Sequence, residues 1–275
     1  MTDSFNKIYQ DSIQKPEEFW KNISEDVFWF KRPTKILNKS KPPFYRWFED
    51  GVTNTCYNAI DIHIDNGNGD KTALIYDSPI TGNKAKFTFN QLKEKISKFA
   101  GALDNQGVKK GDRVIIYMPM IPEAVVAMLA CGRIGAIHSV VFGGFASNEL
   151  ASRIDDSKAK ILITASCGFE PGRTVEYRPL VDGALKLANH KVEKVIFFQR
   201  EAHEVKLNSP LEISWNEALV NAKDKDCVEI GANDFAYILY TSGTTGIPKG
   251  IVRDVGGHIV ALKWTMKNIY NIDEN

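Results

Sequence analysis

Short apolar runs alternate along the chain with segments in which apolar residues recur every three or four positions. The runs are TALIYD (72–77), RVIIY (113–117), AIHSVVF (136–142), KILITA (160–165), KVIFF (194–198) and FAYILY (235–240). Apolar runs of this length are typical of strands that are buried on both faces of a sheet.

Amphipathic helices are predicted between these strands. Thr88 and Gln91 have the spacing of a capping box, and Gly107 suits the end of the helix that follows. The residues that would face the core are Leu92, Ile96, Phe99 and Leu103. Further helices are predicted from Pro122, over 147–155 and over 178–188. This order predicts an α/β fold with a doubly wound, mostly parallel sheet that helices cover on both faces.

The first 70 residues lack this alternation. We interpret 1–70 as an N-terminal arm and entry segment, and 71–275 as an incomplete α/β domain. Pro16 suits the first turn of a short helix. The stretch KRPTKILNKSKPPFYRWF (31–48) carries six basic residues and no acidic one. It is predicted to be a solvated, proline-stiffened linker, with a phosphate-binding patch as the alternative.

The composition of the chain limits which kinds of partner and which cellular compartment are expected. The 275 residues are 43% hydrophobic and 25% charged, and the formal net charge of +1 gives no reason to expect nucleic acid or a membrane surface. No stretch approaches the ~20 apolar residues that would span a bilayer. The four cysteines form no C-x-x-C pair and are expected to be reduced and mostly buried. We expect a cytoplasmic protein.

One loop, TSGTTGIPKG (241–250), carries the clearest chemistry. Its glycines let backbone N–H groups converge on an anion, and four hydroxyls and Lys249 add donors and a charge. Because the loop follows a buried strand, it should lie at the carboxyl edge of the sheet, where open α/β folds bind ligands. Ile247 and Pro248 separate Gly246 from Lys249, so this is not a P-loop. The alternative is a polar loop without a ligand.

Several stretches resemble the adenylate-forming acyl-CoA synthetases, over essentially the whole chain. YTSGTTGIPKG (240–250) is similar to their nucleotide-phosphate signature, and WFEDGVTNTCYNAID (47–61) resembles the entry segment of the short-chain members. GAIHSVVFGGFAS (135–147) resembles their coenzyme A segment. YDSPIT (76–81) and VRDVGGH (252–258) are similar to the propionate-activating branch.

The resemblance implies an ATP-dependent acid–CoA ligase, which converts propionate or acetate, ATP and coenzyme A to acyl-CoA, AMP and pyrophosphate through an acyl-adenylate. It implies that the β- and γ-phosphates, with Mg²⁺, are held by Thr241, Ser242, Gly243, Thr244, Thr245, Gly246 and Lys249. For coenzyme A it implies Phe142, Gly143, Gly144, Glu170, Gly172 and Arg173. Members that activate acetate carry arginine where Glu170 stands. The GGF stretch is alternatively a tight strand-to-helix turn.

Full-length members of that family are much longer. The resemblance therefore implies only a partial N-terminal domain without the C-terminal lid domain, and it places the catalytic lysine and the magnesium-binding carboxylate beyond Asn275. We assign no catalytic or metal-binding residue within the chain. Alternative functions are a non-catalytic remnant that binds nucleotide or coenzyme A, and a partner of a full-length synthetase. An unfinished sheet would also favour self-association through its open edge.

Three other features are expected to be structural. His138 lies in an apolar strand and is predicted to be a hydrogen-bonded core histidine, and His258 is expected to cap the last helix. Asp155 and Asp156 are neighbours on a helix and point about 100° apart, so they cannot face each other as an acid–base pair.

Overall fold

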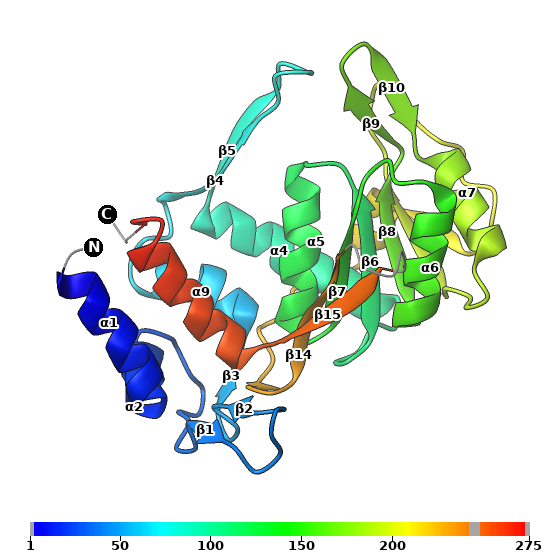
Figure 1. Ribbon diagram of the computed structural model, residues 1–275. Helices are drawn as coiled ribbons and strands as arrows, with labels where there is room; N and C mark the ends of the chain where they lie inside the picture. The colour runs from blue at the N-terminus through cyan, green and yellow to red at the C-terminus, as the bar shows by residue number, and fades with distance from the viewer. Residues whose placement is uncertain (1–2, 242–247, 273–275) are drawn as a thin grey trace.

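A seven-stranded sheet with helices on both faces forms the body of the protein in the computed structural model, which describes residues 3–241 and 248–272 (Figure 1). The strand order is β12-β11-β8-β6-β7-β14-β15. The strands run parallel except for β15, which returns antiparallel to β14. This confirms the predicted doubly wound α/β fold.

The strands of this sheet are β6 (Arg113–Met118), β7 (Ile137–Phe142), β8 (Ile161–Ala165), β11 (Lys194–Phe198), β12 (Glu212–Ser214), β14 (Phe235–Thr241) and β15 (Lys249–Asp254). Strands outside it are β1 (Leu37–Asn38), β2 (Arg46–Trp47), β3 (Val52–Thr53), β4 (Thr72–Asp77), β5 (Lys84–Thr88), β9 (Cys167–Glu170), β10 (Arg173–Glu176) and β13 (Ile230–Gly231). These pair antiparallel as β1·β2, β3·β13, β4·β5 and β9·β10. TALIYD is thus a strand as predicted, but it belongs to a hairpin.

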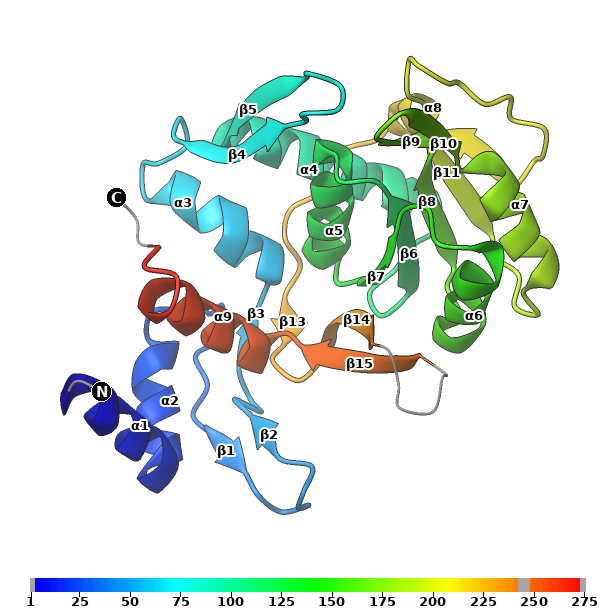
Figure 2. The same cartoon turned by 45° about the horizontal axis from the view of Figure 1, so that its top comes forward.

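The helices are α1 (Asp3–Gln14), α2 (Pro16–Ser24), α3 (Ile62–Asp65), α4 (Phe89–Asn105), α5 (Pro122–Ile134), α6 (Ser147–Ser157), α7 (Arg178–Leu187), α8 (Trp215–Leu219) and α9 (Gly256–Asn268), with a π-helical turn η1 (Tyr57–Asp61) ahead of α3. In both ribbon views α4 and α5 lie on one side of the sheet, and α6 and α7 on the other (Figures 1 and 2).

Local sequence signals explain where α4 begins and ends. Thr88 and Gln91 form the capping box through both reciprocal bonds, and Gly107 follows the helix with a φ of +83°. The four residues expected on its apolar face are all buried. They pack with β6 and β8, whose side chains are almost all buried, in the main hydrophobic core.

A second, smaller core joins the N-terminal segment to the end of the chain. Trp29 and Phe48 are buried with Val255, Ile259 and Val260 from the region of β15 and α9. In Figures 1 and 2, α1, α2 and α9 lie together at one end of the molecule. The prediction that 31–48 is solvated holds for its six basic residues, which are all exposed, but the stretch is more than a linker: it forms the β1–β2 hairpin and ends in a Phe48 side chain that is 1% exposed. The division at residue 70 stays a prediction.

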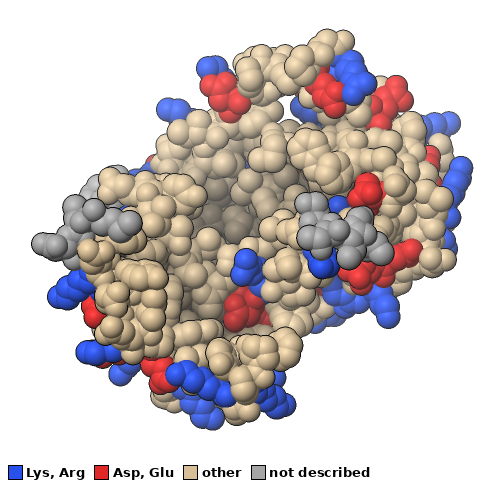
Figure 3. Space-filling model, in the orientation of Figure 1, with Lys and Arg blue, Asp and Glu red and all other residues tan. Residues whose placement is uncertain are grey.

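The face in Figure 3 is hollowed at its centre and lined there mostly by uncharged residues, whereas Lys, Arg, Asp and Glu gather mainly towards the rim. Within the described part of the chain, no helix combines the length and hydropathy needed to cross a membrane.

Candidate functional site

A cleft of about 330 Å³ opens at the carboxyl ends of the parallel strands. Its floor comes from the residues that follow β6 and β7, and its walls come from β9, β10 and the tip of the β4–β5 hairpin. Its lining includes Met118, Phe142, Gly143, Glu170, Tyr177 and Arg200. Since β14 runs parallel to β7, Thr241 ends at this same edge of the sheet. The edge is where open α/β sheets bind ligands.

The turn after β7 is fixed by two buried tyrosines. A Cβ added at Gly143 would lie 2.3 Å from the Tyr177 hydroxyl and 2.8 Å from the Met118 carbonyl oxygen, so only glycine fits there. Gly144 has a φ of +98°, and its N–H donates to the Tyr117 hydroxyl at 3.1 Å. That hydroxyl in turn donates to the Phe145 carbonyl at 2.7 Å. The GGF stretch is thus a tight strand-to-helix turn whose backbone also lines the cleft.

Burial keeps both tyrosines protonated. It raises the pKa of Tyr117 to about 12 and moves the pKa of Tyr177 upward as well. Phe142, by contrast, is largely exposed at the mouth of the cleft. An exposed aromatic ring beside a glycine-lined backbone offers a flat apolar surface on which a planar ring system can stack.

The β9–β10 hairpin brings Glu170 and Arg173 face to face. Pro171 and Gly172 form the turn, with Gly172 at a φ of +79°. Arg173 donates to Glu170 through Nε at 2.8 Å, and its second nitrogen lies 2.6 Å from the same carboxylate oxygen. Both side chains are well exposed, so the pair is weak and an incoming phosphate can compete for the guanidinium. Glu170 lines the cleft, whereas Arg173 does not.

Arg200 is a cleft residue that sequence reasoning missed. It follows β11 by two residues, and its guanidinium lies 4.2 Å from the centre of the Phe169 ring. One of its nitrogens donates to the Cys167 carbonyl at 3.3 Å. A basic residue directly after a buried strand would have signalled it, since the carboxyl ends of parallel strands share one edge.

The hairpin that carries the predicted phosphate loop is described only at its two ends. Thr241 ends β14 and pairs directly with Lys249, which begins β15. Directly opposed side chains project to the same face, so the hydroxyl and the ammonium group stand together. Both residues are exposed, and Lys249 forms no ion pair with any described residue. The expected phosphate ligands Ser242, Gly243, Thr244, Thr245 and Gly246 lie outside the described residues.

The two histidines differ from expectation. His138 is stacked on Tyr237, and burial lowers its pKa to about 4, but no described residue hydrogen-bonds its buried Nδ1. It is therefore a neutral core histidine without the expected bond. His258 lies 3.0 Å from the Tyr237 hydroxyl through Nε2, and it does not cap α9; the carboxylate of Asp254 lies at that helix start. Burial lowers the pKa of His258, and Arg253 adds to this.

The adjacent aspartates point to different partners, as predicted. Asp155 accepts from the backbone of His190 at 2.7 Å, and Asp156 accepts from the Tyr240 hydroxyl at 2.6 Å. The cysteines are all free thiols, and three of the four are buried.

Two family models match nearly the whole chain. The family model described as AMP-binding enzyme matches residues 63–274, and the one described as acetyl-coenzyme A synthetase N-terminus matches residues 5–59. The chain belongs to the AMP-binding enzyme family. This confirms the family resemblance seen in the phosphate loop and the entry segment.

Individual relatives in this AMP-binding family are acyl- and acetyl-CoA synthetases. The mitochondrial acyl-CoA synthetase short-chain family member 3 of Rattus norvegicus is 53% identical over 262 residues, which are 95% of this chain and 38% of that protein. Its Homo sapiens counterpart is 52% identical over the same length. The acetyl-coenzyme A synthetase of Xylella fastidiosa strain Temecula1 is 42% identical over 98% of this chain and 43% of that enzyme.

Among solved structures, the acetoacetyl-CoA synthetase from Streptomyces lividans superimposes with a TM-score of 0.85 at 24% identity. The match covers 96% of this chain and 40% of that structure, and it shows a shared fold. The chain therefore spans about two fifths of the length of these relatives.

Proposed function

We propose that this chain supplies the ATP-phosphate and coenzyme A binding parts of a ligase that joins a short-chain carboxylate, propionate or acetate, to coenzyme A. The observation that carries the proposal is the shared edge: the cleft beside Phe142 and Gly143 and the ends of the phosphate hairpin both lie where parallel strands terminate. Two ligands that react with a common acyl group need neighbouring sites of this kind.

Lys249 and Thr241 have the chemistry for the ATP phosphates. Their side chains stand together on one face of the hairpin and are open to solvent. A lysine without an ionic partner among the described residues is available to neutralise charge on departing pyrophosphate. In this scheme Mg²⁺ arrives bound to ATP as part of the substrate. The described carboxylates and thiols that lie close enough together to be considered as metal ligands, on Cys56, Asp61 and Cys227, come from η1, the residue directly before it and the segment before β13, and not from the hairpin.

In the cleft, the flat aromatic surface of Phe142 and the guanidinium of Arg200 suit the nucleotide end of coenzyme A, whose ring system stacks and whose phosphates pair with arginine. Arg173 is available to a phosphate only when it leaves Glu170. The thiol end would then extend along the glycine turn towards the phosphate hairpin.

Calorimetry on the 275-residue chain tests binding directly. ATP with Mg²⁺ and coenzyme A are titrated separately into wild type and Lys249→Ala. We expect the variant to weaken ATP binding roughly tenfold or more, as for loss of one charged contact, and to leave coenzyme A binding unchanged. If neither ligand binds the wild type, the proposal fails.

Turnover is tested in a chimaera, because the relatives are much longer than this chain. Residues 1–275 replace the matching part of the rat relative, and ATP–pyrophosphate exchange is measured with propionate and with acetate. We expect exchange in the chimaera that Lys249→Ala abolishes, and none from the isolated chain. Ligand binding by the isolated chain together with an inactive chimaera would favour the alternative of a non-catalytic binding protein.

Self-association through the sheet edge belongs to the same proposal. β15 ends the sheet, and Leu239 and Ile251 form a directly opposed apolar pair that is exposed on β14 and β15. An exposed apolar edge favours pairing with a second copy. Sedimentation velocity over a hundredfold range of concentration should show a rising average mass, and a constant monomer would refute this. The compartment stays a prediction: the cytoplasm from the sequence, while the mammalian relatives carry the word mitochondrial in their names.

A further inference from the structure

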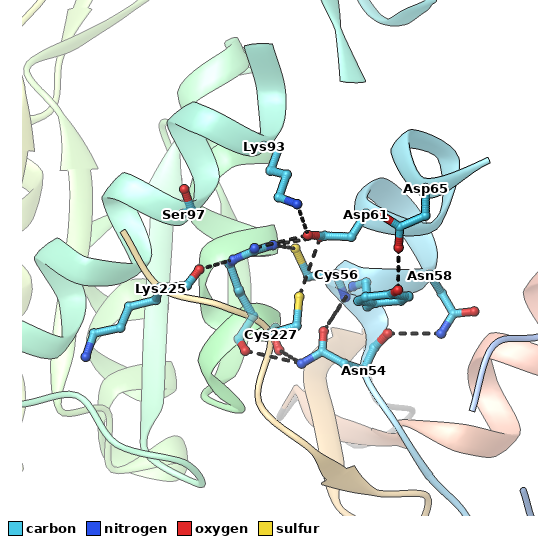
Figure 4. A network of polar contacts seen from close by, with 12 residues as sticks. Asn54, Cys56, Asn58, Asp61, Asp65, Lys93, Ser97, Lys225 and Cys227 are labelled. Carbon is cyan, nitrogen blue, oxygen red and sulfur yellow. Dashed lines mark hydrogen bonds and ion pairs between the residues drawn. The ribbon is translucent and has the colours of Figure 1, made fainter. Parts of the chain in front are cut away.

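A buried polar cluster lies between η1, α5 and the segment before β13, and none of its members lines the cleft (Figure 4). Its centre is the Arg133 guanidinium, whose side chain is 1% exposed. This group binds both carboxylate oxygens of Asp61, at 2.7 and 3.1 Å, and lies 3.5 Å from the Cys56 sulfur. The Cys227 thiol lies 3.6 Å from the same carboxylate.

The two cysteines face each other because of strand pairing. β3 and β13 are antiparallel with Thr53 opposite Ile230, so the segment that follows β3 with Cys56 lies beside the segment that precedes β13 with Cys227. Asn54 holds the two segments together, since its amide donates to the Val228 carbonyl at 2.9 Å and its oxygen accepts from the Cys56 N–H at 2.8 Å. The two sulfur atoms and an Asp61 oxygen all lie within 4.8 Å of one another.

A metal ion does not suit this cluster. Both oxygens of Asp61 are already bound by Arg133, and Lys93 lies 3.0 Å from one of them. A divalent cation would have to displace these contacts and sit beside two positive charges in a buried site, where repulsion is strong. The neighbouring positive charge instead favours a thiolate.

We propose that Cys56 and Cys227 are a redox-modification site that forms a reversible intramolecular disulfide with hydrogen peroxide as oxidant. The thiolate of the pair attacks one peroxide oxygen, the O–O bond breaks, the sulfur becomes a sulfenic acid and hydroxide leaves. The second thiol then attacks the sulfenic sulfur. An S–S bond forms and water leaves, so two thiols and one peroxide give one disulfide and two waters.

Access and acidity both distinguish this pair from the other cysteines. Cys227 is partly exposed and gives a small oxidant a way in to the pair, whereas Cys56, Cys131 and Cys167 are buried. The hydrogen bond from the Cys227 thiol, with help from Arg133, lowers the pKa of Cys56, and that of Cys227 rises in return, so the pair readily holds one negative charge. Burial raises the pKa of Cys131 to about 12 and also raises that of Cys167.

The bond would tie η1 to the segment that leads into β13 and on to the phosphate hairpin. It closes a loop that contains most of the parallel sheet, and cross-links across long loops restrict the unfolded chain most. Oxidation should therefore raise the melting temperature by about 5 °C or more, and a reductant should reverse the rise.

Peptide mapping tests the proposal on the 275-residue chain. The protein is treated with hydrogen peroxide, free thiols are alkylated after unfolding, and peptides are identified by mass spectrometry without reduction. We expect one cross-linked pair containing Cys56 and Cys227, alkylated Cys131 and Cys167, and full reversal by dithiothreitol. The variant Cys227→Ser should form no intramolecular disulfide and show no rise in melting temperature, whereas Cys131→Ala should behave as wild type.

Three results would overturn it: equal oxidation of all four cysteines, disulfides only between molecules, or protection of the pair by zinc added alone at stoichiometric amounts. If Cys227→Ser does not fold, the wild-type peptide map and its melting shift decide the question by themselves.

Discussion

Replacing Arg133 with methionine keeps an unbranched apolar stem and removes a guanidinium that is almost fully buried. Four contacts disappear with it: two bonds to Asp61, the contact with the Cys56 sulfur and a hydrogen bond to the Lys225 carbonyl. Asp61 then keeps only Lys93 as an ionic partner among the described residues, on the solvent side of the cluster.

The expected loss follows from burial. Removing one partner of a buried pair leaves the other charge uncompensated, which costs about 3–5 kcal/mol. Loss of the arginine from the exposed Arg173–Glu170 pair should cost about 0–1 kcal/mol. For a domain of this size 1 kcal/mol corresponds to roughly 2–4 °C, so Arg133→Met should lower the melting temperature by about 10 °C and Arg173→Ala by very little.

Urea unfolding, followed by circular dichroism, gives the free energies of unfolding of both variants and of the double variant Arg133→Met/Asp61→Leu. Because the double variant removes both charges, we expect it to recover most of the lost stability. A loss of less than about 1 kcal/mol for Arg133→Met, a value typical of exposed pairs, would refute the reasoning. So would a double variant that is less stable than the single one.

Three further predictions follow from single contacts. Gly143→Ala should destabilise the fold by about 1–3 kcal/mol through the clash with Tyr177. In the same urea titration Gly132→Ala, inside α5 and with nothing closer than 3.9 Å to its Cβ, should stabilise the fold by up to about 1 kcal/mol. Arg200→Ala should weaken coenzyme A binding by calorimetry about tenfold to a hundredfold, and equal weakening by Arg173→Ala would contradict the cleft assignment. Hydrogen bonds from Thr34 and Lys35 lower the pKa of Asp50 to about 2. Because the pKa is lower in the folded protein, the ionised carboxylate stabilises the fold at pH values above about 4, the pKa of aspartate in the unfolded chain. This stabilisation is lost as the pH falls through about 2. The stability difference between wild type and Asp50→Asn should therefore be greatest above pH 4 and vanish near pH 2.

The sheet and its main helices could be predicted because their signals are local. Buried strands such as β6 and β8 are continuous apolar runs, and the α4 capping box needs only Thr88 and Gln91. The β1–β2 hairpin could not be predicted, since its basic residues are solvated as expected and its strands are only two residues long. Its stability depends on the burial of Phe48 against Val255, more than two hundred residues away. Phe142, Gly143 and Glu170, which are predicted to bind coenzyme A, do line one cleft. Their roles in binding stay predictions.

Arg133 shows why the buried polar cluster could not be predicted from the sequence. In the sequence it is one arginine near the end of an apolar helix, where a favourable interaction with the helix dipole explains it sufficiently. Its partners come from η1 and from the segment before β13, which meet only because β3 pairs with β13. The same pairing brings together two cysteines that the sequence spaces far apart. The short two-residue ladder between β3 and β13 therefore positions both the buried charge pair and the thiol pair. If the β3–β13 pairing organises the cluster, a change that breaks the ladder should abolish disulfide formation and the stabilising effect of Arg133 together.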